Sequence, residues 1–194
     1  PSANLSGRPS STTAAHVEED FGALFPVVEA DTTVEAGLES TILIYQANTW
    51  KMGRLGAIAA ECFTSLLGYT PVLVSPEKKI LCPGQLLRHY SPKARMIFGK
   101  EELVPGCAIL GFLERSYPKE HPFFSLGSLQ DSNLVGQRLY AVLRELDQKG
   151  IESVWVDLDF PKEGLWKTIR ERLERASMKE EGNGKQVRGL QSHR

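Results

Sequence analysis

Hydroxyl and carboxamide side chains near the start of the chain could bind an anion. Ser2 and Asn4 lie in a segment rich in serine, glycine and proline, and Ser10 begins a run of hydroxyl residues directly before a predicted helix. Such groups, together with the free N–H groups at a helix start, favour phosphate binding. The same composition is typical of a solvent loop that caps a helix, and composition alone favours this simpler interpretation.

Two further candidates lie around the first strongly apolar run. Ser40 stands where a β-branched strand over 41–45 is predicted to begin, so its hydroxyl could face a polar ligand or simply bond the strand edge. Arg54 stands between Gly53 and Gly56, just before a predicted helix. Glycines let a backbone approach a ligand closely, and a guanidinium binds phosphate or carboxylate oxygens with two parallel hydrogen bonds. A surface arginine in a turn is the alternative interpretation.

The stretch between Pro83 and Pro92 is the most unusual of the chain. Arg88, His89 and Tyr90 follow one another there without a helical or strand pattern to account for them. A linker with incidental polar residues is the plainer interpretation, and a functional arm is the other. Because no second His or Cys lies at a metal-ligand spacing from His89, the sequence predicts no metal site.

Composition excludes several classes of protein. The chain has 194 residues, of which 41% are hydrophobic and 24% charged, with a net charge of -1. These values are typical of a soluble globular protein. No apolar run reaches the roughly eighteen residues that a membrane helix needs, and near-neutral charge argues against a protein that coats duplex nucleic acid. Three widely spaced cysteines, Cys62, Cys82 and Cys107, exclude a disulfide framework and favour a reducing cytoplasm.

The elements predicted before residue 68 are few. We expect a helix over 13–21 capped by Ser11 or Thr12, a short strand at 27–28, the strand over 41–45, and a helix over 57–67 that places Ile58, Cys62 and Leu66 on one face and stops at Gly68. These elements bury too little apolar surface to close a core. Since the chain also begins with Pro1 inside a motif, we expect the N-terminal part of the parent protein to be missing.

A second unit is predicted after residue 95. Apolar runs favour strands at 96–98, 107–113 and 154–158, and periodic stripes favour helices over 132–149, capped by Ser132, and over 162–178. This alternation indicates a small α/β unit with a largely parallel sheet. The predicted division is a first domain over 1–68, a linker or lid over 69–94, a second domain over 95–178 and a disordered tail over 179–194.

Taken together, these segments resemble a known family. The chain contains, in order, P-S-A-N-x-S-G-x-x-S-x-T, G-x-E-S-T-I, R-x-G-A-I and P-G-x-x-x-R-H-Y-x-P-K-A. This series resembles the long two-domain form of threonylcarbamoyl-AMP synthase. The resemblance runs from residue 1 to about 178 and includes an L-Y-x-x-L-R-E-L-D helix at 139–147. It implies an α/β fold made of the C-terminal part of a YrdC-like catalytic domain, an extended linker and a small Rossmann-like domain.

The resemblance also implies an activity. The family condenses L-threonine, bicarbonate and ATP, with Mg²⁺ expected on the nucleotide, into threonylcarbamoyl-AMP and releases pyrophosphate. The product serves threonylcarbamoyl-adenosine modification of tRNA, so contact with tRNA or RNA and with the tRNA threonylcarbamoyl transferase machinery is implied. By motif, the resemblance implies that Ser2, Asn4, Ser10, Arg54 and Tyr90 bind ATP, and that Ser40 binds threonine.

The chemistry agrees with these assignments. A carbamate and a triphosphate are both anions, so hydroxyls and Arg54 would offset their repulsion. The carbamate decays in open water, and the arm over 69–94 is the predicted lid that excludes water. The family's K-x-R motif and the rest of its threonine pocket lie upstream of Pro1, so we expect the fragment alone to be inactive. Thr168 stands where the family pattern has alanine.

Two alternatives remain open at this point. The first is a carbamoyl-transfer enzyme of the same superfamily, against which count the missing zinc-finger cysteines and acylphosphatase segment. The second is a non-enzymatic RNA-binding or scaffolding module, against which counts the lack of basic patches with interleaved aromatic residues.

Overall fold

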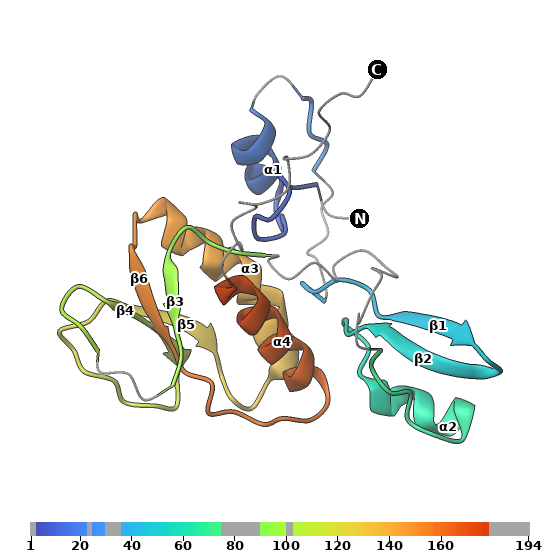
Figure 1. The fold of residues 1–194 in the computed structure, drawn as a ribbon. Coiled ribbons are helices and arrows are strands. Elements are labelled where there is room, and N and C mark those ends of the chain that lie inside the picture. Colours follow the sequence, from blue (N-terminus) through green and yellow to red (C-terminus); the bar gives the residue numbers. More distant parts are fainter. Residues whose placement is uncertain (1–2, 23–24, 30–35, 75–89, 100–102, 179–194) are drawn as a thin grey trace, which may run out of the picture.

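A parallel four-stranded sheet forms the centre of the second half of the chain (Figure 1). The computed structural model describes residues 3–22, 25–29, 36–74, 90–99 and 103–178. The strands lie in the order β3 (Arg95–Ile97), β6 (Ser153–Val156), β4 (Ala108–Phe112) and β5 (Phe123–Gly127), and every neighbouring pair is parallel. The α/β class expected from the sequence is therefore confirmed.

Helices α3 (Ser132–Gln148) and α4 (Leu165–Ser177) pack against each other and against this sheet (Figure 1). Alternate strand positions, among them Leu110, Phe112 and Val156, join the apolar stripes of both helices in a single core. The predicted stripe of α3 is confirmed, because all its members are buried: Val135, Leu139, Val142, Leu143 and Leu146. This core also includes Leu38 and Tyr90, which lie outside the unit predicted over 95–178.

The cap of α3 differs from the expectation. Asp131, and not Ser132, is the N-cap, because its carboxylate accepts hydrogen bonds of 3.0 Å from the N–H groups of Asn133 and Leu134. An ionised carboxylate also interacts favourably with the positive end of the helix dipole. The serine is instead the first residue inside the helix.

Strand β5 is an element that the sequence did not reveal. Its residues follow Pro118 and Pro122 closely, which breaks the apolar pattern before the strand begins. Parallel pairing with β4, which is buried along its whole length, supplies the backbone hydrogen bonds that make these residues a strand. Only the tertiary neighbour reveals it.

A β-hairpin is the main element of the first half. Strands β1 (Ile42–Gln46) and β2 (Thr49–Arg54) pair antiparallel around a two-residue turn at Ala47 and Asn48, both with positive φ. Strand β1 confirms the predicted strand over 41–45. Strand β2 was not predicted, because its glycine and arginine indicated a loop there.

Helix α1 (Ala14–Phe21) confirms the helix expected over 13–21. Its cap is Thr13, whose hydroxyl accepts a hydrogen bond from a backbone N–H of the first turn, and neither Ser11 nor Thr12 takes this role. The candidate hydroxyl run thus lies just outside the helix and not at its cap.

Two other expected elements of the first half do not form as predicted. Residues 25–29 are irregular, and Val28 in the expected strand at 27–28 is 94% exposed. The helix expected over 57–67 is reduced to a 3₁₀ turn, Ala60–Phe63, followed by the single turn of α2 (Thr64–Leu67).

The predicted buried face of that helix is exposed. Ile58 and Leu66 are 52% and 81% exposed, and Cys62 is exposed too. A helix of one turn cannot present a stripe at four-residue spacing, so the local core is small and consists of Met52, Leu55 and Ala60. The predicted stop at Gly68 is confirmed by its left-handed φ of 77°.

The first end of the predicted linker is paired with the hairpin. Val72 O accepts from the Met52 N–H at 2.9 Å, and the Val74 N–H donates to Met52 O at 2.8 Å. Residues 75–89 lie outside the described residues.

The second end of the linker is tied to both halves of the chain. The Ser91 N–H donates to Gly7 O at 2.9 Å, and the Ser91 hydroxyl donates to Ala176 O of α4 at 2.7 Å. The division into domains stays a prediction, and the tail over 179–194 lies outside the described residues. In the described part of the chain, no helix is long and apolar enough to cross a membrane.

Candidate functional site

Three of the predicted site residues, Ser10, Ser40 and Arg54, meet at one short segment. Arg54 Nε and Nη2 donate to the Ser40 carbonyl oxygen at 3.1 and 2.9 Å, and Nη2 lies 3.1 Å from Ser40 Oγ. Ser10 Oγ donates to Oε1 of Glu39 at 2.8 Å. Because Glu39 and Ser40 are chain neighbours, one dipeptide links the candidate hydroxyl loop to the candidate arginine.

Tyr90 belongs to the same cluster. It is 1% exposed and has a left-handed φ of 64°, and its ring centroid lies 5.2 Å from that of Tyr140. The Arg172 guanidinium lies 4.9 Å from the centre of the same ring. Burial raises the pKa of Tyr90, and the charges of Arg172, Glu39 and Arg54 also act on it. The arm's tyrosine therefore packs against two side chains that both bond Glu39.

The opening motif contributes loop structure. Ser2 lies outside the described residues. The Asn4 amide nitrogen donates to Leu5 O at 3.0 Å and to Arg8 O at 3.2 Å. These bonds hold the turn that precedes Ser10, so within the described chain Asn4 shapes its own loop.

Gly56 allows two segments of the site to touch. A Cβ at this position would lie 2.3 Å from the Thr41 nitrogen and 2.4 Å from Glu39 O. The Thr41 hydroxyl also donates to Ile58 O at 2.6 Å and accepts from the Ile58 N–H at 3.0 Å. The glycine predicted to let the backbone approach a ligand here lets it approach the Glu39–Thr41 backbone instead.

Glu39, which sequence reasoning missed, forms hydrogen bonds with several residues of the site. Its Oε2 accepts hydrogen bonds from Tyr140 OH at 2.8 Å and from Arg172 Nε at 2.9 Å, while Oε1 accepts one from the Ser10 hydroxyl. Burial would raise the pKa of Glu39, but the Arg172 charge and the bonds from Ser10 and Tyr140 outweigh it and lower the pKa. The signal available in the sequence was a single carboxylate in an otherwise neutral G-x-E-S-T-I segment.

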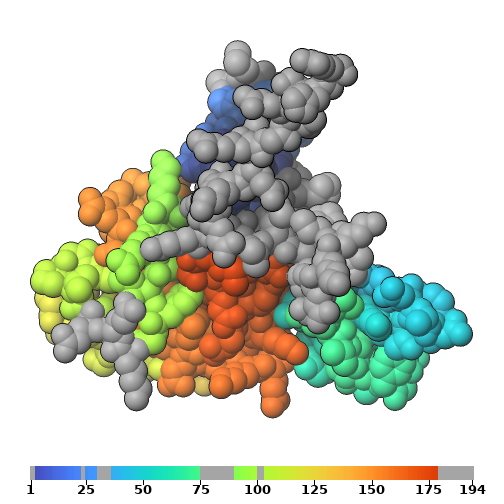
Figure 2. Space-filling view, viewed as in Figure 1, coloured from blue at the N-terminus to red at the C-terminus, as the bar shows by residue number. Residues whose placement is uncertain are grey.

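Helix α4 fixes the loop that follows β2. Arg172, which is fully buried, donates from Nη2 to Leu55 O at 2.7 Å. Thr168 is 1% exposed and donates to Gly56 O at 3.0 Å, a bond that an alanine could not make. Figure 2 shows α4, in orange-red, in contact with the blue-green segment that follows β2. The second unit thus holds the backbone next to Arg54.

Helix α3 fixes the Ser10 loop in the same way. Arg144 is fully buried and donates from Nη2 to Pro9 O at 2.7 Å and from Nε to Ser10 O at 3.4 Å. Its charge is balanced by Asp20 of α1, whose Oδ2 lies 2.8 Å from Nη2. Burial would raise the pKa of Asp20, but the bond from Arg144 and the Leu5 N–H lower it. Two buried arginines therefore attach both candidate loops to the second unit.

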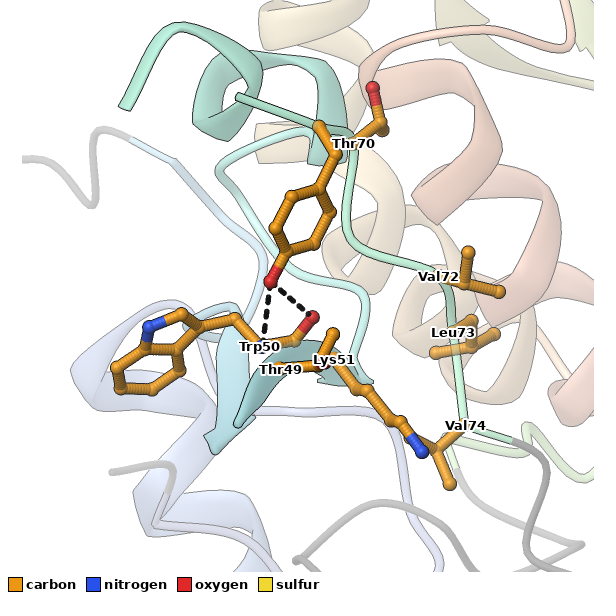
Figure 3. Close-up of a pocket in the computed structure, with 8 residues that line it drawn as sticks. Thr49, Trp50, Lys51, Thr70, Val72, Leu73 and Val74 are labelled. Atoms are coloured by element: carbon orange, nitrogen blue, oxygen red, sulfur yellow. Dashed lines mark hydrogen bonds between the residues drawn. The ribbon is translucent and has the colours of Figure 1, made fainter. Parts of the chain in front are cut away.

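A separate groove lies on the hairpin side of the molecule (Figure 3). It has a volume of about 380 Å³ and is lined by Thr49, Trp50, Lys51, Tyr69, Thr70, Val72, Leu73 and Val74. The Tyr69 hydroxyl closes one side by accepting from the Trp50 N–H at 2.7 Å. The predicted site residues do not line this groove, so it is distinct from the cluster around Glu39.

The cluster offers a guanidinium and hydroxyl groups that could hold a charged substrate. Arg54 donates to the Ser40 hydroxyl, and the Ser10 hydroxyl donates to Glu39. The Glu39 carboxylate is also paired with Arg172. Within the described ranges, His, Cys, Asp and Glu side chains do not gather in threes that could hold a metal ion. The arrangement suits binding and positioning of a charged substrate by hydrogen bonds.

Comparison with known proteins identifies the family. The family model described as "Threonylcarbamoyl-AMP synthase, C-terminal domain" matches residues 55–178, which is more than half of the chain. The chain belongs to this family. The resemblance read from the motifs is therefore confirmed.

Curated threonylcarbamoyl-AMP synthases match most of the chain. The protein of Schizosaccharomyces pombe is 29% identical over 210 residues, that of Bacillus subtilis 29% over 196 residues and that of Pyrococcus abyssi 26% over 197 residues. Each match covers 91% of this chain but only 51% of the first relative and 56% of the other two. The chain thus spans about half the length of the curated relatives it matches.

Solved structures of a threonylcarbamoyl-AMP synthase have the same fold. The crystal structure of Pyrococcus abyssi Sua5 complexed with L-threonine matches with a TM-score of 0.74 and 26% identity, over 91% of this chain and 56% of that one. A variant of that protein, with a histidine and the tyrosine after it replaced by alanine, matches with a TM-score of 0.73 and 25% identity. The fold predicted from the resemblance is confirmed.

Proposed function

We propose that this chain carries substrate-binding loops, the arm and the C-terminal domain of an enzyme that makes threonylcarbamoyl-AMP from L-threonine, bicarbonate and ATP, releasing pyrophosphate. One observation carries the proposal. Ser10, Ser40, Arg54 and Tyr90 come from four separate segments of a chain of this family, yet Ser10 bonds Glu39 and Arg54 bonds the next residue, Ser40. Tyr90 packs on Tyr140 and Arg172, which both bond Glu39. Such convergence is expected of a substrate site and not of incidental surface loops.

Arg54 would offset the repulsion between the negatively charged reactants. The threonine nitrogen adds to bicarbonate with loss of water, and an oxygen of the resulting carbamate attacks the α-phosphorus of ATP. The bond to the β-phosphate then breaks, and pyrophosphate leaves. Two anions must approach, so the Arg54 guanidinium beside Ser40 would offset their repulsion. Mg²⁺ would reach the site on the ATP substrate.

Ser40 would bind threonine. Its Oγ lies beside Arg54, and its backbone is locked by the contact between Gly56 and the 39–41 segment. The related Pyrococcus abyssi Sua5 was solved with L-threonine, which supports an amino-acid site in this fold. A serine held in this way positions a substrate without being a nucleophile.

Tyr90 would close the nucleotide site. The chain contains one His-Tyr dipeptide, His89–Tyr90, and a histidine–tyrosine pair is the one replaced in the related variant. In the described structure Tyr90 is packed between Tyr140 and Arg172. An arm anchored in this way would exclude water from the carbamate.

The proposal is tested with the full-length protein that contains this chain. We expect pyrophosphate release that requires both L-threonine and bicarbonate, and we expect Arg54→Ala to reduce its rate by about 10²-fold or more. Arg138→Ala, an exposed arginine on α3, is the matched control and should keep the rate. Equal rates in Arg54→Ala and the control would refute the proposal.

The same assay separates the alternatives. Turnover of carbamoyl phosphate, without turnover of bicarbonate plus threonine, would identify a carbamoyl-transfer enzyme. Salt-sensitive RNA binding without nucleotide binding would identify an RNA-binding module. Contact with tRNA, the downstream transferase machinery and a cytoplasmic location stay predictions from the sequence.

A further inference from the structure

We propose that Glu39 fixes the Ser10 hydroxyl as a hydrogen-bond acceptor toward the substrate, so that Ser10 contacts a donor on the nucleoside part of ATP and not a phosphate. The donor is a ribose hydroxyl or the adenine amino group. This inference rests on the proposed function and makes Glu39 a positioning residue.

The direction of the Ser10–Glu39 bond is determined by chemistry. A serine hydroxyl has one proton and two lone pairs, whereas an ionised carboxylate can only accept. Glu39 is held ionised because Arg172 Nε and Tyr140 OH both donate to its Oε2, at 2.9 and 2.8 Å. The 2.8 Å bond between Ser10 Oγ and Glu39 Oε1 therefore uses the only proton of the serine.

The remaining capacity of Ser10 is acceptance. Ser10 is 5% exposed, so water does not compete freely for its proton. Phosphate oxygens carry lone pairs and negative charge, and they would face the serine lone pairs unfavourably. Ribose hydroxyls and an adenine amino group carry protons and would bond to them.

Ser40 has the opposite role, which provides an internal comparison. Arg54 Nη2 lies 3.1 Å from Ser40 Oγ, and a guanidinium cannot accept a hydrogen bond. The arginine therefore occupies a lone pair of Ser40, and the serine proton remains available for an acceptor such as a carboxylate. The two serines of the site thus differ in hydrogen-bonding role because their neighbours differ.

Substitution of Glu39 by glutamine would reverse the Ser10 bond. Arg172 and Tyr140 both donate, so the carboxamide oxygen must face them and the amide nitrogen must face Ser10. The amide then donates to Ser10 Oγ, and the serine proton turns toward the substrate. Glu39→Gln therefore changes the hydrogen-bonding role of Ser10 without changing the size of the side chain.

The test is calorimetric binding by the full-length protein, with and without substitutions. The ligands are ATP, 2′-deoxy-ATP, 3′-deoxy-ATP, the triphosphate of purine riboside (which lacks the amino group) and inorganic pyrophosphate. We expect one nucleoside analogue to bind the unsubstituted protein about three- to tenfold more weakly than ATP. That difference should vanish in Ser10→Ala and in Glu39→Gln and persist in Ser40→Ala.

The controls separate a lost contact at Ser10 from a general loss of ligand binding. Ser65→Ala, an exposed serine outside the motifs of the predicted site, should behave as the unsubstituted protein. Pyrophosphate affinity should be equal in the unsubstituted protein and in Ser10→Ala. If Glu39→Gln does not fold, as judged by thermal melting, the Ser10→Ala series alone decides.

Two results would overturn the inference. One is a loss of pyrophosphate affinity in Ser10→Ala, because Ser10 would then contact phosphate. The other is an analogue difference that persists in Ser10→Ala, or no analogue difference at all. A folded protein that binds neither ATP nor pyrophosphate would instead refute the proposed function itself.

Discussion

Replacement of Arg172 by methionine is the sharpest test of how the two halves of the chain are joined. Methionine keeps the apolar stem but removes the charge and every donor. The side chain of Arg172 is fully buried, and that of Glu39 is 13% exposed. Arg172→Met would therefore leave a nearly buried carboxylate without its cation, and Leu55 O without the donor at 2.7 Å.

The expected cost follows from burial. Removing one partner of a buried ion pair destabilises a protein by about 3–5 kcal/mol, because the remaining charge stays desolvated. Lys149→Met is the control, since Lys149 forms an exposed pair with Glu145 at 2.9 Å, with side chains 60% and 42% exposed. Such a surface pair contributes about 0.5 kcal/mol or less.

The assay is urea unfolding of the full-length protein and of four variants: Arg172→Met, Glu39→Gln, the double variant and the control Lys149→Met. Glutamine in place of Glu39 removes the unpaired charge that Arg172→Met creates. We therefore expect the double variant to be more stable than the sum of the single effects by about 0.5–3 kcal/mol.

Two results would contradict this reasoning. If Arg172→Met costs less than about 1 kcal/mol, the pair does not hold the halves together. If the two single effects simply add, Arg172 and Glu39 do not interact energetically, whatever their 2.9 Å separation.

Two further predictions concern the same interface. Burial raises the pKa of Glu39, but the charge of Arg172 outweighs burial and holds that pKa below its ordinary value of 4.5. The ionised carboxylate therefore stabilises the fold above pH 4.5. This stabilisation is lost as the pH falls through the lowered pKa. The unfolding free energy of the unsubstituted protein should therefore fall more steeply than that of Glu39→Gln between about pH 6 and pH 3, and parallel curves would count against the shift. Gly37→Ala should cost more than Gly68→Ala in thermal melts. Both glycines have a left-handed φ, of 63° and 77°, and alanine in that conformation costs about 1–2 kcal/mol at either position. Only at Gly37 would the added Cβ also clash with α3, because it would lie 2.2 Å from Gln137 Cα. Equal costs at the two positions would show that α3 moves away without a loss of stability.

Local periodicity made several elements predictable. The stripe of α3 repeats at helical spacing, and the apolar run of β4 marks a strand covered on both faces, so both could be read without knowing their neighbours. The stop at Gly68 was equally local, because glycine adopts left-handed φ without steric cost.

Elements that depend on a partner were misread. Strands β2 and β5 carry glycine or follow prolines, and each becomes a strand only through pairing with β1 or β4. The helix expected over 57–67 failed for a related reason, since the face with Ile58 and Leu66 does not meet a core among the described residues. Hydrophobic periodicity predicts which face of a segment could be buried. It does not predict whether another part of the protein packs against that face.

For the candidate site, the sequence by itself determined the chemical groups, and the tertiary structure decided their relations. Motif order predicted six binding groups: Ser2, Asn4, Ser10, Ser40, Arg54 and Tyr90. The central role of Glu39 could not be predicted, because its partner Arg172 lies 133 positions away in the sequence. A hydrogen bond depends on distance in space, which sequence separation does not reveal. Only the fold therefore decides which serine hydroxyl donates a hydrogen bond, which one accepts, and which charged side chain fixes each role.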